Sequence, residues 1–415
     1  MTKLNILHLS DIHFGHPDID NEQDRLISGI TKALNENEIK TDLIIFTGDL
    51  TQRALPSEFQ NGEDWLRTIQ SITGGKILVC PGNHDMDRTE ANTETLRLAY
   101  SSEESFQLSK SKIYKNHSHI KPFMDWHQNA SERDDNFISM WKDQIFTTSS
   151  KISIKNIDIH IVALNTAALS CGNDDEGKLC VDVAALNSAL KGADSNKEFV
   201  ISIGHHPING WLPNWNSEKI STILEQENGP HIYMHGHVHN HQTLGSYQSS
   251  GSGLCYFTSG AAYQGSKWPQ SFSVLTVDFL KREIINDIFS YHSTSGRWDH
   301  DPSSSRPIPI RLPDIKKEKE KTIIQSPQEK NIRRWDNPFD NVASNSLSPD
   351  IIPELFVDEN NSINRISKSF DSMIEGQRGT GKTMLLRYLS IEVQSYIVEK
   401  NNLNVLESFR EKKII

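Results

Sequence analysis

The sequence predicts an α/β fold in which two mixed β-sheets pack together and helices lie outside them. Short apolar runs rich in β-branched residues recur between residues 4 and 279, and each run ends in polar or glycine-rich sequence, as buried strands do. Helix-length segments separate the early runs, whereas the later runs lie closer together. This change of spacing indicates mixed sheets rather than one parallel sheet.

The predicted elements follow in order along the chain. We expect strands at 4–11, 42–49, 76–85, 157–166, 198–206, 232–239, 255–262 and 272–279. Helices are expected at 22–38 and 58–72, between the first three strands. The polar, helix-like stretch from about 88 to 148 interrupts the strand pattern, and we interpret it as an insertion over one end of the sheets.

A change in composition after Asp301 predicts a domain boundary. Residues 302–350 are rich in Pro, Ser, Asn and Lys, which is typical of a linker. The chain is therefore expected to contain a domain at 1–301, this linker, and a second, incomplete domain at 351–415.

The composition is that of a protein without a membrane partner. Hydrophobic residues make up 36% and charged residues 23% of the chain, and no run approaches the ~18 apolar residues of a membrane span. The N-terminus lacks the basic start and uninterrupted apolar core of a signal peptide. Four cysteines without a Cys-x-x-Cys pair fit a reducing compartment, so we expect a cytoplasmic protein.

The charge distribution leaves nucleic acid as an alternative partner. A formal net charge of −11 opposes a general affinity for nucleic acid, although a local basic groove remains compatible with it. Residues 109–121 contain Lys110, Lys112, Lys115 and Lys121 and no acidic residue. We interpret this segment as a solvated helix face, with a nucleic-acid groove as the alternative.

Polar residues gather where the predicted strands end. Five separate segments supply them: Asp11 and His13, Asp49, Asn83 with His84 and Asp85, His205, and His237 with His239. Residues 231–241 alone hold five of the 17 histidines. Side chains at positions i and i+2 of an extended chain point to the same face. Asp11 with His13, and His237 with His239, are therefore expected to aim two ligands at one point.

This combination of residue types predicts a metal centre. Carboxylates, imidazoles and one amide oxygen, with no thiolate, suit Mn, Fe or Zn. The seven candidate ligands, Asp11, His13, Asp49, Asn83, His205, His237 and His239, are too many for one ion. They fit two divalent ions about 3.5 to 4 Å apart that share one carboxylate, an arrangement that serves in-line displacement at phosphorus.

The order Asp-x-His, Gly-Asp, Gly-Asn-His-Asp, His and Gly-His-x-His resembles the calcineurin-like metallophosphoesterases over about residues 1–300. The resemblance implies a four-layer α/β/β/α sandwich that hydrolyses phosphodiesters with a metal-bound hydroxide. It also implies two ligand sets. Asp11, His13, Asp49 and His239 would hold the first ion, and Asp49, Asn83, His205 and His237 the second.

The resemblance assigns roles to the remaining polar residues of the motifs. His84 is not a ligand in this assignment, and it would stabilise charge on the phosphate or protonate the leaving oxygen. Asp85 would position its loop. His205 is preferred over His206 because the family's ligand is similar to the first His of a His-x-Pro sequence. Replacing His239 with alanine is expected to abolish turnover without unfolding the protein.

A second motif lies near the C-terminus. GQRGTGKT at 376–383 matches the phosphate-binding loop G-x-x-x-x-G-K-[ST], with a predicted strand at 370–375 before it and a helix at 384–397 after it. Loop amides at Gly376, Gly379 and Gly381 together with Lys382 would hold the phosphates of ATP, and Thr383 would contact Mg.

This C-terminal region resembles the start of an AAA or STAND-type ATPase module. Only 32 residues follow Thr383, too few for a Walker B strand or a lid, so we expect the rest of the module to be missing or on another chain.

The patterns together favour a phosphodiesterase for cyclic nucleotides or other small phosphodiesters, acting as an effector that a fused nucleoside triphosphatase regulates. A DNA or RNA nuclease is one alternative, and a nucleotide-binding switch with a non-catalytic phosphoesterase scaffold is another. Protein phosphatase activity is disfavoured because residues 48–54, GDLTQRA, lack the sequence Gly-Asp-x-x-Asp-Arg-Gly.

Overall fold

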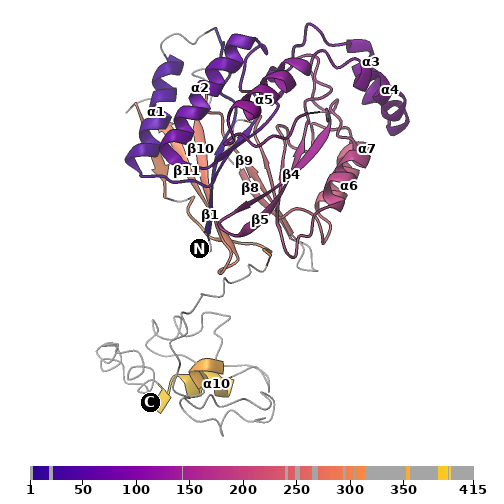
Figure 1. Cartoon of the computed structure of the whole chain (residues 1–415). Coiled ribbons are helices and arrows are strands. Elements are labelled where there is room, and N and C mark those ends of the chain that lie inside the picture. Colours follow the sequence, from indigo (N-terminus) through magenta and orange to yellow (C-terminus); the bar gives the residue numbers. More distant parts are fainter. Residues whose placement is uncertain are drawn as a thin grey trace, which may run out of the picture. The chain divides into compact units, whose positions relative to one another are not determined.

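The computed structural model describes residues 3–17, 22–142, 144–238, 242–247, 253–263, 270–292, 296–302, 304–313, 352–355, 382–390 and 392–393. The chain divides into two compact units, Met1–Glu318 and Lys319–Ile415. Figure 1 shows the described helices and strands of each unit.

The first sheet of the N-terminal unit is mixed. Its strand order is β12-β11-β10-β1-β2-β3, and the two-residue strand β13 pairs in addition with the start of β11. β1, β2 and β3 are parallel to one another, whereas β10 is antiparallel to β1. The strands are β1 (Lys3–Leu9), β2 (Leu43–Thr47), β3 (Lys76–Cys80), β10 (Ser271–Asp278), β11 (Glu283–His292), β12 (Arg297–Asp301) and β13 (Ile308–Pro309).

The second sheet is also mixed, in the order β4-β5-β6-β7-β9-β8. β5, β6, β7 and β9 are parallel, and β4 and β8 are antiparallel edge strands. The strands are β4 (Thr147–Ile154), β5 (Ile157–Leu164), β6 (Phe199–Ile203), β7 (Ile232–His235), β8 (Gln242–Tyr247) and β9 (Gly253–Thr258). The predicted α/β fold with two mixed sheets is confirmed.

Helices cover the outer sides of the sheets. α1 (Glu22–Glu36) and α2 (Pro56–Thr73) accompany the first sheet, and α6 (Val183–Lys191) and α7 (Asn214–Leu224) accompany the second, as Figure 1 shows. α3 (Thr93–Ala99), α4 (Glu103–Lys115) and α5 (Lys121–Arg133) occupy the stretch that we expected to be a helical insertion. A short 3-10 turn, η1 (Asn83–Asp85), follows β3.

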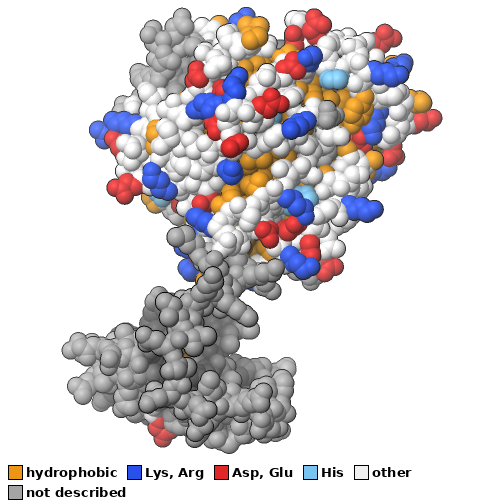
Figure 2. All heavy atoms as spheres, viewed as in Figure 1, with side chains coloured by type: hydrophobic (Ala, Val, Ile, Leu, Met, Phe, Trp, Pro, Cys, Tyr) orange, Lys and Arg blue, Asp and Glu red, His pale blue; other side chains and the backbone are white. Residues whose placement is uncertain are grey.

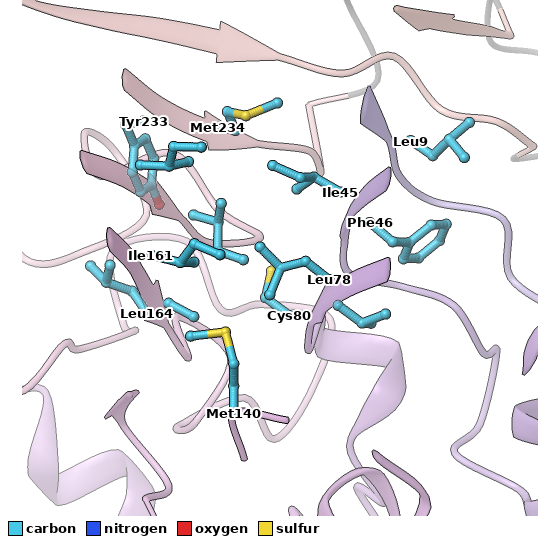
Figure 3. Close-up of a cluster of buried hydrophobic side chains, with 14 of the residues drawn as sticks. Leu9, Ile45, Phe46, Leu78, Cys80, Met140, Ile161, Leu164, Tyr233 and Met234 are labelled. Atoms are coloured by element: carbon cyan, nitrogen blue, oxygen red, sulfur yellow. The ribbon is translucent and has the colours of Figure 1, made fainter. Parts of the chain in front are cut away.

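The main core lies between the two sheets. All residues of β2 and β6 are buried, as expected for parallel strands covered on both faces. Figure 3 shows side chains of the first sheet, Ile45 and Leu78, facing Ile161 and Met234 of the second. Their burial fixes the face-to-face packing of the sheets, and this packing brings the ends of both sets of parallel strands together.

The compact N-terminal unit extends past the boundary expected from the sequence. β13 pairs with β11, and Ile310 and Leu312 are buried in the main core. The segment expected to be a linker from residue 302 therefore begins as part of this unit. The proline-rich composition led us to expect the end of the domain too early in the chain, because proline is compatible with a short edge strand such as β13.

The second unit contains two described helices, α8 (Ile352–Leu355) and α10 (Lys382–Tyr388). The proposed phosphate-loop residues Gly376, Gly379 and Gly381 lie outside the described residues. Lys382 and Thr383 begin α10, and their side chains also lie outside the described part of the chain.

Two of the four lysines in residues 109–121 form ion pairs with acidic side chains. Lys110 of α4 forms an ion pair with Asp182, which is fully buried at the start of α6, and Lys121 pairs with Asp125. Lys112 and Lys115 are exposed. On the face shown in Figure 2, acidic and basic side chains are interspersed.

No helix in the described part of the chain combines the length and the hydropathy that a membrane span requires.

Candidate metal centre

The polar motif residues lie at the carboxyl ends of parallel strands. Asp11 and His13 follow β1, Asp49 follows β2, and Asn83 belongs to the turn after β3. In the second sheet, His205 follows β6 and His237 follows β7. The carboxyl ends of neighbouring parallel strands meet at one edge of a sheet, where α/β proteins build their sites. Sheet packing then brings the two edges together.

The backbone at these positions is not extended, which corrects our expectation that residues two apart share the face of a strand. β1 ends at Leu9, and Asp11, His13 and Asp49 have φ angles of 55°, 51° and 57°. His237 has a φ angle of 66°. These left-handed conformations are rare for residues other than glycine, and strain of this kind gathers at functional sites.

Backbone hydrogen bonds hold the strained loops together. The amide of Asp11 donates to the carbonyl of Gly48 at 3.0 Å, and the amides of Ile12 and His13 donate to the carbonyl of Asp49 at 3.0 Å. The loop after β1 is therefore fastened to the loop after β2. This explains why Asp11 and His13 converge with Asp49 although their chain segment has left the strand.

His205 lies at the middle of the cluster. Its Nε2 atom is 3.2 Å from Oδ2 of Asp49, 3.1 Å from Oδ1 of Asn83 and 3.1 Å from Nδ1 of His237. Its Nδ1 atom donates to the carbonyl of Thr47 at 2.6 Å. That hydrogen bond fixes the ring and leaves Nε2 as the atom that faces the other ligand candidates.

The donor atoms are close enough to hold cations. Ligand atoms within 4.8 Å of one another form three groups: Asp11, Asp49, His205 and His237; His13, Asp49 and His84; and His205, His206 and His237. Asp49 belongs to the first two groups, as a shared carboxylate would. Oxygen and nitrogen donors without thiolates suit Mn, Fe or Zn, so these residues fit such ions.

The charges of the cluster are interdependent. Burial by itself would raise the pKa of Asp49, but His205, His84 and His13 hold it well below its usual range. Burial opposes protonation of His205, yet Asp49 and Asp11 raise the pKa of His205 to about 9. Two carboxylates at this depth require nearby positive charge, which protonated histidine or a bound cation supplies.

Two glycines allow the close approach of the motif loops. A Cβ atom on Gly82 would overlap the backbone nitrogen and Oδ1 of Asp49. A Cβ atom on Gly236 would lie 2.6 Å from Oδ2 of Asp11 and would overlap the hydroxyl of Ser10. Side chains at these positions would displace the two carboxylates.

His84 and Asp85 have different surroundings. The Nδ1 atom of His84 donates to the carbonyl of Gln52 at 3.0 Å, and the amide of His84 donates to Oδ1 of Asp49 at 2.7 Å. Asp85 is fully buried, and its carboxylate accepts from the amides of Gly82 at 2.9 Å and Thr51 at 2.8 Å. Asp85 thereby ties the loop after β3 to the loop after β2.

One ring nitrogen of His206 contacts a residue outside the set of ligand candidates. Its Nδ1 atom is 2.9 Å from the hydroxyl oxygen of Thr166, which also accepts from the amides of His205 at 3.2 Å and His206 at 3.0 Å. His205, and not His206, contacts Asp49 and Asn83. His239 lies outside the described residues, so its assignment stays a prediction.

Sequence reasoning missed several residues around the centre. Thr166 orients the His205–His206 pair, the carbonyl of Gln52 orients His84, and the indole of Trp211 contacts the ring of His237. A backbone carbonyl leaves no signal in a sequence. Trp211 follows the His-His-Pro motif at a distance of several residues, and only the loop conformation brings it back to the cluster.

Comparison with known proteins gives matches for both parts of the chain. A sequence model of the calcineurin-like phosphoesterase family matches residues 4–241, and an ORC-CDC6-like model matches residues 337–413. A curated relative, the cAMP/cGMP dual specificity phosphodiesterase of Mycobacterium tuberculosis (strain CDC 1551 / Oshkosh), is 29% identical over 93 residues. The match spans 20% of this chain and only 28% of that protein.

Solved structures with a similar arrangement include two phosphatases. A purple acid phosphatase from yellow lupin (Lupinus luteus) seeds has a TM-score of 0.44 and 14% identity, over 72% of this chain and 53% of that chain. The 5'-nucleotidase of Candida albicans has a TM-score of 0.38 and 13% identity, over 71% of this chain and 52% of that chain.

Proposed function

The chain belongs to the calcineurin-like phosphoesterase family, and on this premise we propose that its N-terminal unit is a binuclear, metal-dependent phosphodiesterase. Its substrate in this proposal is a cyclic nucleotide or another small phosphodiester. The similarity to a phosphodiesterase of cyclic nucleotides supports this choice of substrate class. The observation that carries the proposal is the shared position of Asp49 in two groups of closely spaced ligand atoms.

The proposed ligand sets keep the division implied by the motifs. Asp11, His13, Asp49 and His239 hold one ion, and Asp49, Asn83, His205 and His237 hold the other. Two bound divalent ions, Mn, Fe or Zn, supply charge neutralisation at the phosphoryl group and an activated water. The contacts of His205 with Asp49, Asn83 and His237 support the second set in particular.

His84 acts on the substrate in this proposal rather than on the ions. Because a carbonyl oxygen only accepts, the bond to Gln52 requires a proton on Nδ1 of His84. The imidazolium form then has Nε2–H available to donate to a phosphoryl oxygen or to the leaving oxygen. Asp85 positions the loop of His84 through its bonds to backbone amides.

The experiment that tests the proposal is Mn-dependent hydrolysis of bis-p-nitrophenyl phosphate, with metal content measured on the same samples. The wild-type protein should contain two ions per chain and lose activity with a chelator. Replacing Asp49 with asparagine should reduce activity to that of buffer and lower the metal content, because the shared carboxylate is lost. Asp64→Asn, on an exposed position of α2, is the matched control and should keep both properties.

A metal-free wild-type protein that hydrolyses the diester at full rate would reject the proposal. A panel of cyclic nucleotides, single-stranded DNA and duplex DNA identifies the substrate. Cleavage confined to small diesters would remove the nuclease alternative, which is already weakened because Lys110 and Lys121 are paired with Asp182 and Asp125.

We also propose that the C-terminal unit binds ATP with Mg and regulates the phosphodiesterase. The ORC-CDC6-like match at residues 337–413 and the GQRGTGKT motif support a nucleoside triphosphate as the ligand.

A further inference from the structure

Trp211 is an aromatic residue at the accessible side of the metal centre. Its ring centroid is 4.1 Å from that of His237, and the two rings are nearly perpendicular at 81°. It also lies 5.2 Å from the ring of the fully buried His206, with an angle of 33°. Trp211 is partly exposed.

The exposure of the cluster shows from which side a substrate must arrive. Asp11, Asp49 and His205 are almost fully buried. Of the described motif residues together with Trp211, the partly exposed ones are His84, His237 and Trp211. The indole therefore lies next to a part of the cluster, His237, that solvent and hence a diester can reach.

The loop that carries Trp211 is anchored at both ends. Ile208 and Leu212 are buried in the main core, and the carbonyl of Trp211 accepts from the amide of Leu179 at 3.2 Å. Gly210 has a φ angle of 86°, which turns the chain just before the indole, and a Cβ atom there would meet nothing within 4 Å. The backbone on both sides of Trp211 is thus held in place, so little ordering of the loop remains to be done when a ligand binds.

We propose that Trp211 is the stacking platform for a nucleobase, and that it makes the enzyme prefer nucleotides to phosphodiesters that lack a base. This inference rests on the proposed phosphodiesterase function. The phosphate lies at the metal centre while the flat base packs against the exposed part of the indole. Because every base has a π-face, the platform favours nucleotides as a class without strong choice among bases.

The test compares two inhibitors that differ only in the base. AMP and ribose 5-phosphate are assayed as competitive inhibitors of bis-p-nitrophenyl phosphate hydrolysis by the full chain with Mn. The wild-type protein should bind AMP more tightly. The preference for AMP is the inhibition constant of ribose 5-phosphate divided by that of AMP. Trp211→Leu should reduce this ratio by roughly 5- to 150-fold, the range that base stacking supplies. Trp211→Phe should retain most of the ratio.

Trp215→Leu is the matched control, since this nearby indole donates to the carbonyl of Tyr100 instead. The ratio does not depend on the fraction of folded protein. Equal weakening of both inhibitors in Trp211→Leu would mean that the indole only supports His237, and the inference would be overturned. Unchanged inhibition constants in Trp211→Leu, or a wild-type protein that does not favour AMP, would also overturn it. Absence of any diester hydrolysis would instead reject the proposed function.

Discussion

At the scale of single residues, the candidate metal centre depends on side chains that are each oriented by a hydrogen bond to a backbone carbonyl. His205 is oriented by the carbonyl of Thr47 and His84 by the carbonyl of Gln52. His84 also belongs to a group of ligand atoms with His13 and Asp49, so its distances alone are compatible with a ligand. His84 is therefore either a metal ligand or, as proposed, a proton donor, and an experiment can distinguish the two roles.

His84→Asn should reduce kcat by about 10²- to 10⁴-fold, the usual contribution of a positioned acid, and should leave two ions bound per chain. The reason is that the proton donor is lost while the ligand set is kept. Metal content by plasma mass spectrometry and steady-state kinetics are the measurements. Loss of one ion would show that His84 is a ligand.

Gly236→Ala should remove metal binding because the added methyl group would lie 2.6 Å from Oδ2 of Asp11 and overlap Ser10. The expected result is loss of diesterase activity with the circular dichroism spectrum retained. Gly192→Ala is the control, since its Cβ atom would come no nearer than 3.8 Å to His160. Wild-type metal content in Gly236→Ala would contradict the close approach of Gly236 to Asp11 and Ser10.

At the scale of elements, the parallel strands position the site, and one buried histidine helps to hold β6 and β7 in register. His231, just before β7, accepts at Nδ1 from the amide of Val200 in β6 at 2.9 Å. Its own amide donates to the carbonyl of Val200 at 2.9 Å. Burial, together with the charge of Arg311, lowers the pKa of His231 to about 3. The register of β6 and β7 therefore relies on a neutral imidazole.

This lowered pKa predicts acid sensitivity. The unfolded chain takes up the proton near pH 6.5 but the folded chain only near pH 3, so the stabilisation is complete above pH 6.5 and is lost as the pH falls toward 3. At pH 5 the loss is about 2 kcal/mol. Urea unfolding of the wild type and His231→Gln should show a stability difference that shrinks by about this amount between pH 7.5 and 5. A difference independent of pH would contradict the assignment.

At the scale of the whole molecule, a family with metal-dependent hydrolytic chemistry is joined to a second unit with an ORC-CDC6-like match. The proposed regulation requires that the second unit binds a nucleoside triphosphate. Lys382 is the residue of the motif whose charge would contact the phosphates.

Lys382→Ala should weaken binding of ATP with Mg by about 10- to 100-fold, as expected when a charged hydrogen bond to a phosphate is lost. Calorimetry on the full chain is the measurement, and Lys400→Ala, outside the motif, is the control. Addition of ATP should also change the rate of diester hydrolysis in the wild type but not in Lys382→Ala. Equal affinity in both proteins would remove the proposed phosphate loop.

Much of the fold was predictable because strand signals are local. The eight predicted strand segments correspond to β1, β2, β3, β5, β6, β7, β9 and β10. The ends were placed too late where a motif followed, as in the segment 76–85, since β3 stops at Cys80. The strands β4, β8, β11, β12 and β13 were not predicted. Of these, β4, β11, β12 and β13 are partly exposed, and such strands lack the continuous apolar run of a buried one.

The sequence by itself determined the types of donor in the centre and the strand end to which each belongs, because motif spacing and hydrophobic runs are properties of neighbouring residues. Only the tertiary structure decided that five strand ends meet and that Asp11, His13 and His237 turn into the site with positive φ angles. The same holds for Trp211, which contacts His237 from another loop. Such contacts depend on how the two sheets pack, and packing joins residues that are far apart in the chain.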